Sequence, residues 1–174
     1  EGIIVSYKGE VIASGEAKAV RNSLDEVWSA KGVDLKNTLE ELYEIISFVR
    51  RITPKLKTAL NEAFFWSGKT DGIGGELVAL NISKSKKGIT LEGLINRNSI
   101  DMPKWEDKPK IWEATSREYA NQVSGEVRAV IGDKLRKGNV WENYELPALK
   151  QNPNVTKIIT IDPKTRKEKI IFKR

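Results

Sequence analysis

The spacing of apolar residues changes near residue 125, from mostly helical periods before it to strand-like runs after it. The strongest helix is predicted over Leu39–Val49, where apolar residues form one stripe. The sequence Thr38-Leu39-Glu40-Glu41 has the capping-box spacing that favours a helix start. Pro54 is expected to end this helix, because proline cannot continue one.

Weaker patterns predict the remaining elements before residue 125. They are a hairpin of Ile3–Tyr7 and Val11–Ala13, a helix over Val20–Trp28 that could stop at Gly32, a helix carrying Leu56, Leu60 and Phe64 toward Trp66, a loop or flexible helix entry over Gly68–Gly75, an ambiguous helix or strand over Leu77–Ile82, a short helix over Leu91–Ile95 capped by Thr90, a loop over Met102–Pro109, and a helix over Ile111–Val123.

Two strands, Val127–Ile131 and Val155–Ile161, are predicted in the last third of the chain. They should be parallel neighbours, because a helical crossover through Leu146–Lys150 separates them. Asp162-Pro163-Lys164-Thr165 then predicts a turn into Ile170–Phe172. The expected fold class is α/β. We expect one domain, with a mainly helical lobe over residues 1–100 packed on an α/β lobe over 101–174 whose small sheet follows Gly125.

The composition restricts the possible catalytic chemistry more than it restricts the possible fold. The 174 residues include neither Cys nor His. A disulfide framework, a thiolate nucleophile, a Ser-His triad and a Cys-rich zinc site are therefore excluded, as is the commonest metal ligand. Any catalysis must use carboxylates, hydroxyls, Lys or Arg, with aromatic rings to position the substrate, and we expect neither a metal nor a resident cofactor.

The formal net charge of +6 is concentrated at the end of the chain, where residues 164–174 hold six cationic side chains against Glu168. Such a run more often keeps an edge strand from pairing with other chains than binds nucleic acid or an acidic partner, and we favour the first interpretation. No apolar run is long enough to span a membrane, so we expect no stable membrane insertion. The start Glu1-Gly2-Ile3 suggests a piece of a longer protein.

Gly68-Lys69-Thr70 looks like the end of a phosphate-binding P-loop. That motif needs a glycine five residues before its Gly-Lys, and this position is Ala63 within an apparently helical pattern. We therefore reject a nucleoside triphosphatase. Backbone N–H groups of this loop could still approach a phosphate, although a solvent-exposed loop is the simpler interpretation.

Five ordered motifs carry a resemblance to the ADP-ribosyl cyclase / NAD glycohydrolase family. They are Phe65-Trp66-Ser67, Thr90-Leu91-Glu92, the helix segment Ile111–Ala120, the strand Gly125–Val130, and Asn143–Leu149 followed by a strand ending at Ile161. The resemblance covers residues 64–161. Two departures stand out: the animal members are held by disulfides, and Gly68 stands where those enzymes have an Arg that contacts phosphate.

The resemblance implies a role for each of eight residues. Glu145 is the catalytic carboxylate, although spacing alone does not decide whether a carboxylate before Leu-Pro is a functional acid or an ordinary helix-start residue. Trp66 and Trp112 position the nicotinamide. The residues expected to bind other parts of NAD⁺ are Glu92 and Asp101 at the pocket rim, Ser67 and Ser116 at ribose or phosphate, and Trp141. NAD⁺ is the substrate here, not a cofactor.

The chemistry is coherent with this residue set. NAD⁺ already carries a pyridinium leaving group, so its cleavage needs no imidazole acid. One carboxylate beneath the ribose can stabilise the oxocarbenium character of the transition state, and indole faces attract the cationic ring.

The Cys-free, basic chain is also similar to the C-terminal toxin domains of bacterial contact-dependent or Rhs-type inhibition proteins. This resemblance implies delivery from a cell surface, action in the target-cell cytoplasm, and an acidic immunity protein as partner. Disulfide-free folding suits a domain that refolds in a reducing cytosol. The alternative functions are a basic ribonuclease toxin, which the missing His disfavours, and a non-enzymatic binding module. We regard nucleic acid as an unlikely partner.

Overall fold

The computed structural model describes residues 2–7, 10–16, 18–22 and 33–174, and the chain divides into two compact units, Glu1–Arg51 and Ile52–Arg174. In the first unit, β1 (Ile3–Tyr7) and β2 (Glu10–Gly15) pair antiparallel, which confirms the predicted hairpin. Of the helix expected over Val20–Trp28, residues 18–22 are helical and residues 23–32 lie outside the described part.

The long helix predicted over Leu39–Val49 is α2 (Val33–Ile52), which begins before the capping-box sequence. It ends in a 3₁₀ turn, η1 (Thr53–Lys55), that contains Pro54 as expected. The capping-box pattern therefore misplaced the helix start, because the helix is already formed at Val33.

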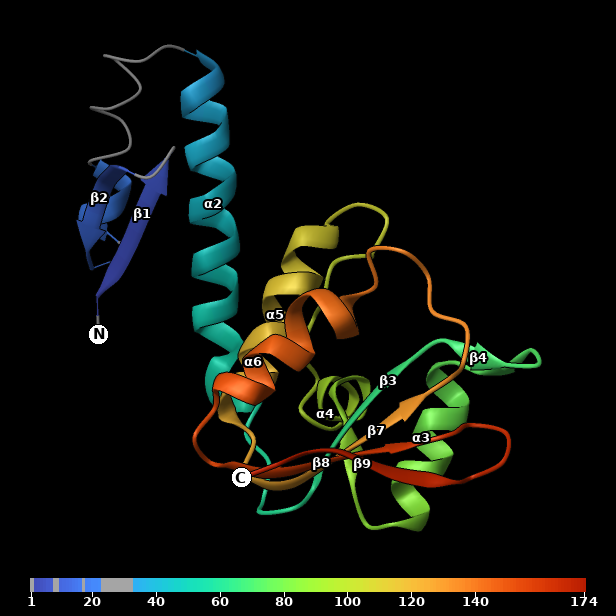
Figure 1. Ribbon diagram of the computed structural model, residues 1–174. Helices are drawn as coiled ribbons and strands as arrows, with labels where there is room; N and C mark the ends of the chain where they lie inside the picture. The colour runs from blue at the N-terminus through green and yellow to red at the C-terminus, as the bar shows by residue number, and fades with distance from the viewer. Residues whose placement is uncertain (1, 8–9, 17, 23–32) are drawn as a thin grey trace. The chain divides into compact units, whose positions relative to one another are not determined.

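The second unit contains a five-stranded sheet in the order β6-β3-β7-β8-β9, and β3, β7, β8 and β9 are labelled in Figure 1. The strands are β3 (Ala63–Ser67), β6 (Ile89–Thr90), β7 (Gly125–Ile131), β8 (Val155–Ile161) and β9 (Glu168–Lys173). The first four strands in the spatial order are parallel, and β9 pairs antiparallel with β8. The predicted parallel pairing of β7 and β8 is confirmed, and α6 (Leu146–Gln151) lies in the crossover between them.

The helix predicted through Leu56, Leu60 and Phe64 is wrong, because residues 63–67 form strand β3. The sheet therefore takes β3 and β6 from before residue 100, not only strands that follow Gly125. The physical reason is burial. A central parallel strand is covered on both faces and shows a continuous apolar run in place of an alternating one.

The helices of the second unit are α3 (Glu76–Ser85), α4 (Leu91–Arg97), α5 (Pro109–Gln122), the π-helix η2 (Trp141–Glu145) and α6. The ambiguous segment Leu77–Ile82 is thus helical. Thr90 caps α4 as predicted, its Oγ1 accepting a hydrogen bond of 3.1 Å from the Gly93 N–H. The loop expected over Gly68–Gly75 contains a small hairpin of β4 (Lys69–Thr70) and β5 (Ile73–Gly74).

Helices cover both faces of the sheet. On one face, Phe64 and Val130 pack with Ile82 of α3. On the other face, the ring of Phe65 lies 4.9 Å from that of Tyr119 in α5 and 5.9 Å from that of Trp141 in η2. Neighbouring residues of a strand point to opposite faces, so Phe64 and Phe65 belong to different halves of the core.

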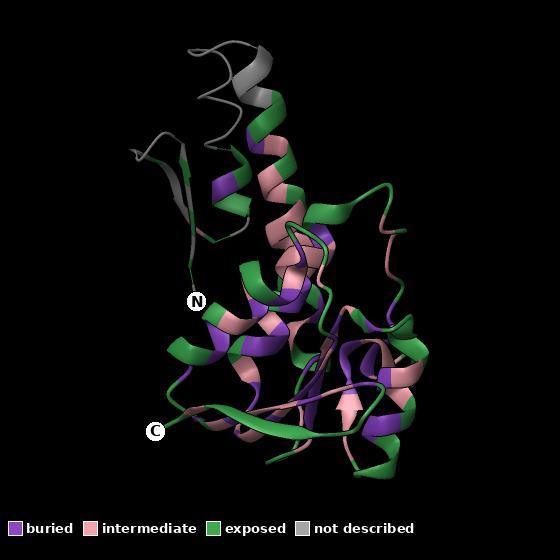
Figure 2. Ribbon diagram, turned by 45° about the vertical axis from the view of Figure 1, so that its right-hand side comes forward, coloured by how far each residue is buried: buried purple, intermediate pink, exposed green. Residues whose placement is uncertain are grey.

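Burial falls sharply from the middle of the sheet to its β9 edge (Figure 2). Val127, Ala129 and Ile158 are fully buried, whereas Ile170 in β9 is 54% exposed. The described part of the chain contains no helix with the length and apolar character needed to span a membrane.

Candidate active site

A cavity of about 580 Å³ opens where the parallel strands end. Ser67 and Gly68 at the carboxyl end of β3 line it, together with Lys134 just beyond β7. Ligands of α/β proteins bind at the carboxyl ends of strands, because the loops that vary in sequence gather there. Its chemically active side chains are four indoles, two carboxylates and three cations: Trp66, Trp105, Trp112, Trp141, Glu92, Glu145, Lys69, Lys134 and Arg136.

Glu145 is the buried carboxylate of the cavity, with 7% of the residue exposed. It is the last residue of the π-helix η2, which places it beside the sheet. Burial raises the pKa of this carboxyl well above its ordinary value, and the nearby charge of Glu92 raises it further. Short π-helical stretches are rare and occur often at functional sites. Burial thus disfavours the ionised carboxylate, and a cation bound beside it would offset that penalty.

Glu92 and Trp66 form the second part of the site. Glu92 is in the first turn of α4, and its Oε2 accepts a hydrogen bond of 3.1 Å from the indole N–H of Trp66. Burial raises the pKa of Glu92, while hydrogen bonds from its own backbone N–H and from Trp66 oppose that rise. This bond links two residues that both line the cavity and restrains the orientation of the indole.

Helix α5 contributes Trp112 and Ser116, which are one turn apart on the same helix face and both line the cavity. The Trp112 indole N–H donates to the carbonyl oxygen of Pro103 at 2.8 Å, so the preceding loop sets the orientation of its ring. Trp141 is 3% exposed and packs against Phe65, which anchors this ring in the core.

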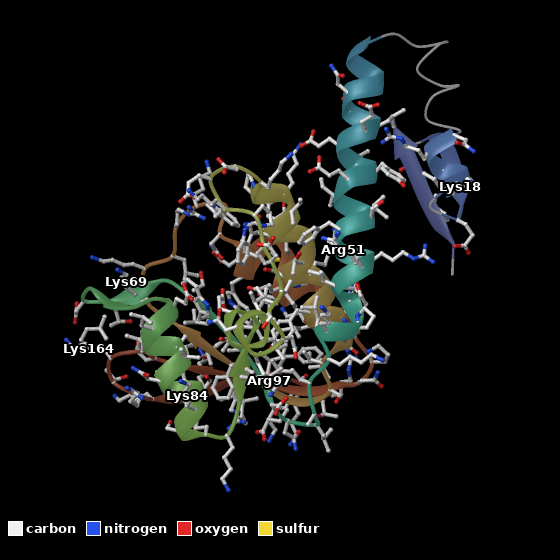
Figure 3. The ribbon with its side chains drawn as sticks, turned by 180° about the vertical axis from the view of Figure 1, so that it is seen from behind. Lys18, Arg51, Lys69, Lys84, Arg97 and Lys164 are labelled. Atoms are coloured by element: carbon white, nitrogen blue, oxygen red, sulfur yellow. The ribbon has the colours of Figure 1, made fainter. Side chains whose placement is uncertain are left out.

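Three cationic residues form the basic wall of the cavity: Lys69, Lys134 and Arg136. Lys69 of the β4–β5 hairpin, labelled in Figure 3, is held to Lys134 by an isolated antiparallel bridge. The two backbone bonds of this bridge are 3.2 and 3.1 Å long. The Arg136 guanidinium lies 6.0 Å from the ring centre of Trp105. No carboxylate within the described ranges forms an ion pair with these cations, which leaves their charge available to an anion.

Seven of the eight residues predicted from the sequence line this cavity: Trp66, Ser67, Glu92, Trp112, Ser116, Trp141 and Glu145. Asp101 does not; it is exposed in the segment after α4. Glu142 is exposed as well, whereas Glu145 lines the cavity.

Sequence reasoning missed the basic wall, Trp105 and Asn139. The only sequence signal for the wall was Gly68-Lys69-Thr70, which was rejected as a P-loop. The rejection of that motif agrees with the structure, because no helix of the P-loop kind follows and β4 begins at Lys69. The residues described contain no cluster of three or more carboxylate, His or Cys side chains that could hold a metal ion.

Comparison with protein-family models gives no match, and comparison with curated proteins gives none either. Among solved structures, the chain is similar to Aplysia cyclase complexed with the substrate NGD and the product cGDPR, at 22% identity and a TM-score of 0.45, over 61% of this chain and 50% of that one. It is also similar to a mutant of ADP-ribosyl cyclase, at 22% identity and a TM-score of 0.43, over 61% of this chain and 51% of that one.

A third similar structure is ADP ribosyl cyclase complexed with N1-cIDPR, at 23% identity and a TM-score of 0.46. The match covers 67% of this chain and 55% of that one. The chain therefore spans about half the length of these solved proteins.

Proposed function

We propose that this protein cleaves the nicotinamide–ribose bond of NAD⁺, as an NAD⁺ glycohydrolase with or without ADP-ribosyl cyclase activity. The observation that carries the proposal is the buried Glu145 carboxyl inside a cavity walled by indole rings. A cationic aromatic ring fits such a cavity, because indole faces attract cations by about 2 kcal/mol or more when water is excluded. The nicotinamide ring of NAD⁺ is a cation of that kind.

The proposed reaction needs little from the protein beyond placement and charge. When the ribose C1′–N bond breaks, its electron pair leaves with the nicotinamide nitrogen, and positive charge develops on the ribose. Ionised Glu145 stabilises that charge from within the cavity. Water then attacks C1′ to give ADP-ribose and one proton, or the adenine ring of the same molecule attacks to give a cyclic product.

The basic wall suits the other end of the same substrate. The diphosphate of NAD⁺ carries two negative charges, and Lys69, Lys134 and Arg136 offer three cationic side chains at the cavity. In our proposal they take over the phosphate contact that the resemblance assigns to an Arg where this chain has Gly68. Trp66 and Trp112 position the nicotinamide, and Ser67 and Ser116 bind ribose or phosphate.

The decisive test is the product profile of purified protein with NAD⁺, followed by ¹H NMR. We expect free nicotinamide to appear with ADP-ribose, cyclic ADP-ribose or both. Glu145→Gln keeps shape but removes the charge, so kcat should fall by about 10²–10³ with a smaller change in KM. Glu142→Gln is the matched control and should stay active, since its side chain keeps an oxygen that accepts the bond from Asn139.

Two results would contradict the proposal. Wild-type protein that leaves NAD⁺ intact while cutting tRNA would favour the ribonuclease alternative. Equal losses in the two glutamate variants would leave the enzyme class standing and refute the assignment of Glu145.

We further propose that the protein acts as a delivered antibacterial toxin, neutralised in the producing cell by an acidic immunity protein. The lack of Cys and the net charge of +6 support this context. Inducible expression in a bacterial cytoplasm should lower cellular NAD⁺ and stop growth, and Glu145→Gln should relieve both effects. Growth arrest that persists in this variant with normal NAD⁺ would argue against the toxin mechanism.

A further inference from the structure

Asn139 is a buried polar residue at the cavity, next to the turn that carries Glu145, and it is 4% exposed. Its side-chain amide donates to the Arg136 carbonyl oxygen at 2.8 Å and to Glu142 Oε1 at 2.7 Å. Its Oδ1 accepts a bond of 2.9 Å from the Glu142 backbone N–H. One side chain thus joins the turn that presents the buried carboxyl to the backbone of Arg136, whose carbonyl oxygen also accepts from the Asn139 backbone N–H at 3.2 Å.

The backbone of Asn139 makes separate contacts with the same turn. Its carbonyl oxygen accepts from the Asn143 side-chain amide at 2.8 Å and from the Asn143 backbone N–H at 3.3 Å. The helical conformation begins at the next residue, so Asn139 is the N-cap of the segment that contains η2 and α6. Its acceptance from the third residue of the helix is the usual N-cap bond.

The start of a π-helix decides where its later side chains point. A π turn holds more residues than an α turn, so moving or losing it rotates Trp141 and Glu145 relative to the sheet. An α-helical turn at this site would not place the same residues toward the cavity. The capping bonds at Asn139 therefore fix the direction of the carboxyl, and not only the stability of the helix.

We propose that Asn139 is a positioning residue of the active site, which holds the π-helical turn and the Arg136 backbone in register so that Glu145 faces the substrate. This inference rests on the proposed function. Asn139 acts through Glu145 and takes no part in bond breaking. Because a displacement of about 1 Å can cost roughly 10² in rate, the expected effect falls on turnover.

The most selective variant is Asn139→Ser. Its hydroxyl keeps the cap acceptor for the Glu142 N–H, but it cannot reach both Arg136 and Glu142 as a donor. We expect kcat for NAD⁺ to fall at least 10-fold, with KM within about 3-fold of wild type and little change in Tm. Asn143→Ala is the control. It removes the side-chain hydrogen bond to the Asn139 carbonyl oxygen. That oxygen still accepts from the Asn143 backbone N–H, so kcat should stay within about 2-fold of wild type.

Exchanging the amide and the carboxylate between positions 139 and 142 gives an independent test of the Glu142 contact. Asn139→Asp keeps the cap but places a carboxylate against Glu142, so it should be less active than Asn139→Ser. Adding Glu142→Gln supplies a donor for that carboxylate and should restore kcat at least 3-fold. A double variant no more active than the single one would overturn the proposed register.

A readout without turnover separates this inference from the proposed function. In protein labelled with ¹³C at the Glu carboxyls, the Glu145 resonance is assigned by its loss in Glu145→Gln. Its titration midpoint should move by at least half a pH unit in Asn139→Ser and stay unchanged in Asn143→Ala. Unchanged kcat and an unchanged midpoint in Asn139→Ser would overturn the positioning role. A wild type inactive on NAD⁺ but with a shifted midpoint in Asn139→Ser would refute the function and leave the positioning of Glu145 supported.

Discussion

Glu145 is a carboxyl that the fold keeps away from water, so protons and the substrate cation compete for it. Burial and the charge of Glu92 raise its pKa, which shifts its equilibrium toward the protonated form while the cavity is empty. A cationic ring bound nearby favours the ionised form instead. Binding of NAD⁺ should therefore release a proton and tighten as the pH rises through the raised pKa of Glu145.

Calorimetry measures this proton directly. Titrating NAD⁺ or a non-cleavable analogue into the protein in buffers of different ionisation enthalpy should show net proton release at neutral pH, with a value between zero and one. Glu145→Gln should abolish the release. An equal release in that variant would assign the proton to another group, with Glu92 as the next candidate.

The same burial costs stability at neutral pH. A carboxyl whose folded pKa lies above its unfolded pKa contributes stability below the unfolded value, and this contribution is lost as the pH rises to the folded pKa. We therefore expect Glu145→Gln to raise Tm at pH 7 and to have almost no effect near pH 4. Each pKa unit corresponds to about 1.4 kcal/mol, and a gain of 1 kcal/mol raises Tm by roughly 2–4 °C in a chain of this size.

Thermal scans of wild type and variant across this pH range provide the check. A Tm difference independent of pH would show that the substitution acts through packing, not through the ionisation of Glu145.

At the scale of the elements, the basic wall forms where two loops approach each other closely. A methyl group added at Gly132 would lie 2.3 Å from the backbone nitrogen and carbonyl carbon of Lys69, far inside contact distance. The Lys69–Lys134 bridge therefore depends on the absence of a side chain at position 132. Gly132→Ala should displace the β4–β5 hairpin, lower Tm by several degrees and raise KM for NAD⁺ more than it lowers kcat.

Gly138→Ala is a useful comparison, because nothing lies within 4 Å of a methyl group there although its φ of +76° makes the substitution strained. It should lower Tm through local backbone strain and leave KM near wild type. A KM equally raised in both variants would indicate that general loosening of the loop, not the Lys69 contact, controls binding.

Some helices and strands could be predicted from sequence patterns and others could not. β7 and β8 were predictable because their β-branched runs are bounded by turn residues and joined by a helix of crossover length. The Thr90 cap was predictable because its hydrogen bond is local. By contrast, Leu56, Leu60 and Phe64 mimic a helical stripe, and only pairing with β7 makes residues 63–67 a strand.

The residues of the site also divide into those that a short sequence motif identifies and those that only the folded structure brings to the cavity. Its two carboxylates and two of its indoles lie in ordered short motifs, which is why a family resemblance could identify Trp66, Trp112 and Glu145. Lys134 and Arg136 follow no motif and reach the cavity only because a bridge joins the segment after β7 to Lys69. The spacing between Glu92 and Asp101 does not show which way either side chain points, and Asp101 is exposed outside the cavity.

For the whole molecule, every residue that lines the cavity lies between Phe64 and Glu145, inside the unit Ile52–Arg174. This unit also contains all five strands of the main sheet. We expect a chain of residues 52–174 to fold and to consume NAD⁺ within about 2-fold of the full chain. Circular dichroism and the NAD⁺ assay on both forms provide the measurement. A folded but inactive shorter form would assign residues 1–51 a part in catalysis.

The distribution of tryptophan has a practical consequence for work in solution. Four of the five indoles line one cavity, and the fifth, Trp28, lies outside the described residues. Near-ultraviolet emission of the unlabelled protein therefore comes mainly from the walls of the binding site. Entry of a nicotinamide ring should quench that light, so the occupancy of the cavity can be followed optically, in real time and without a dye.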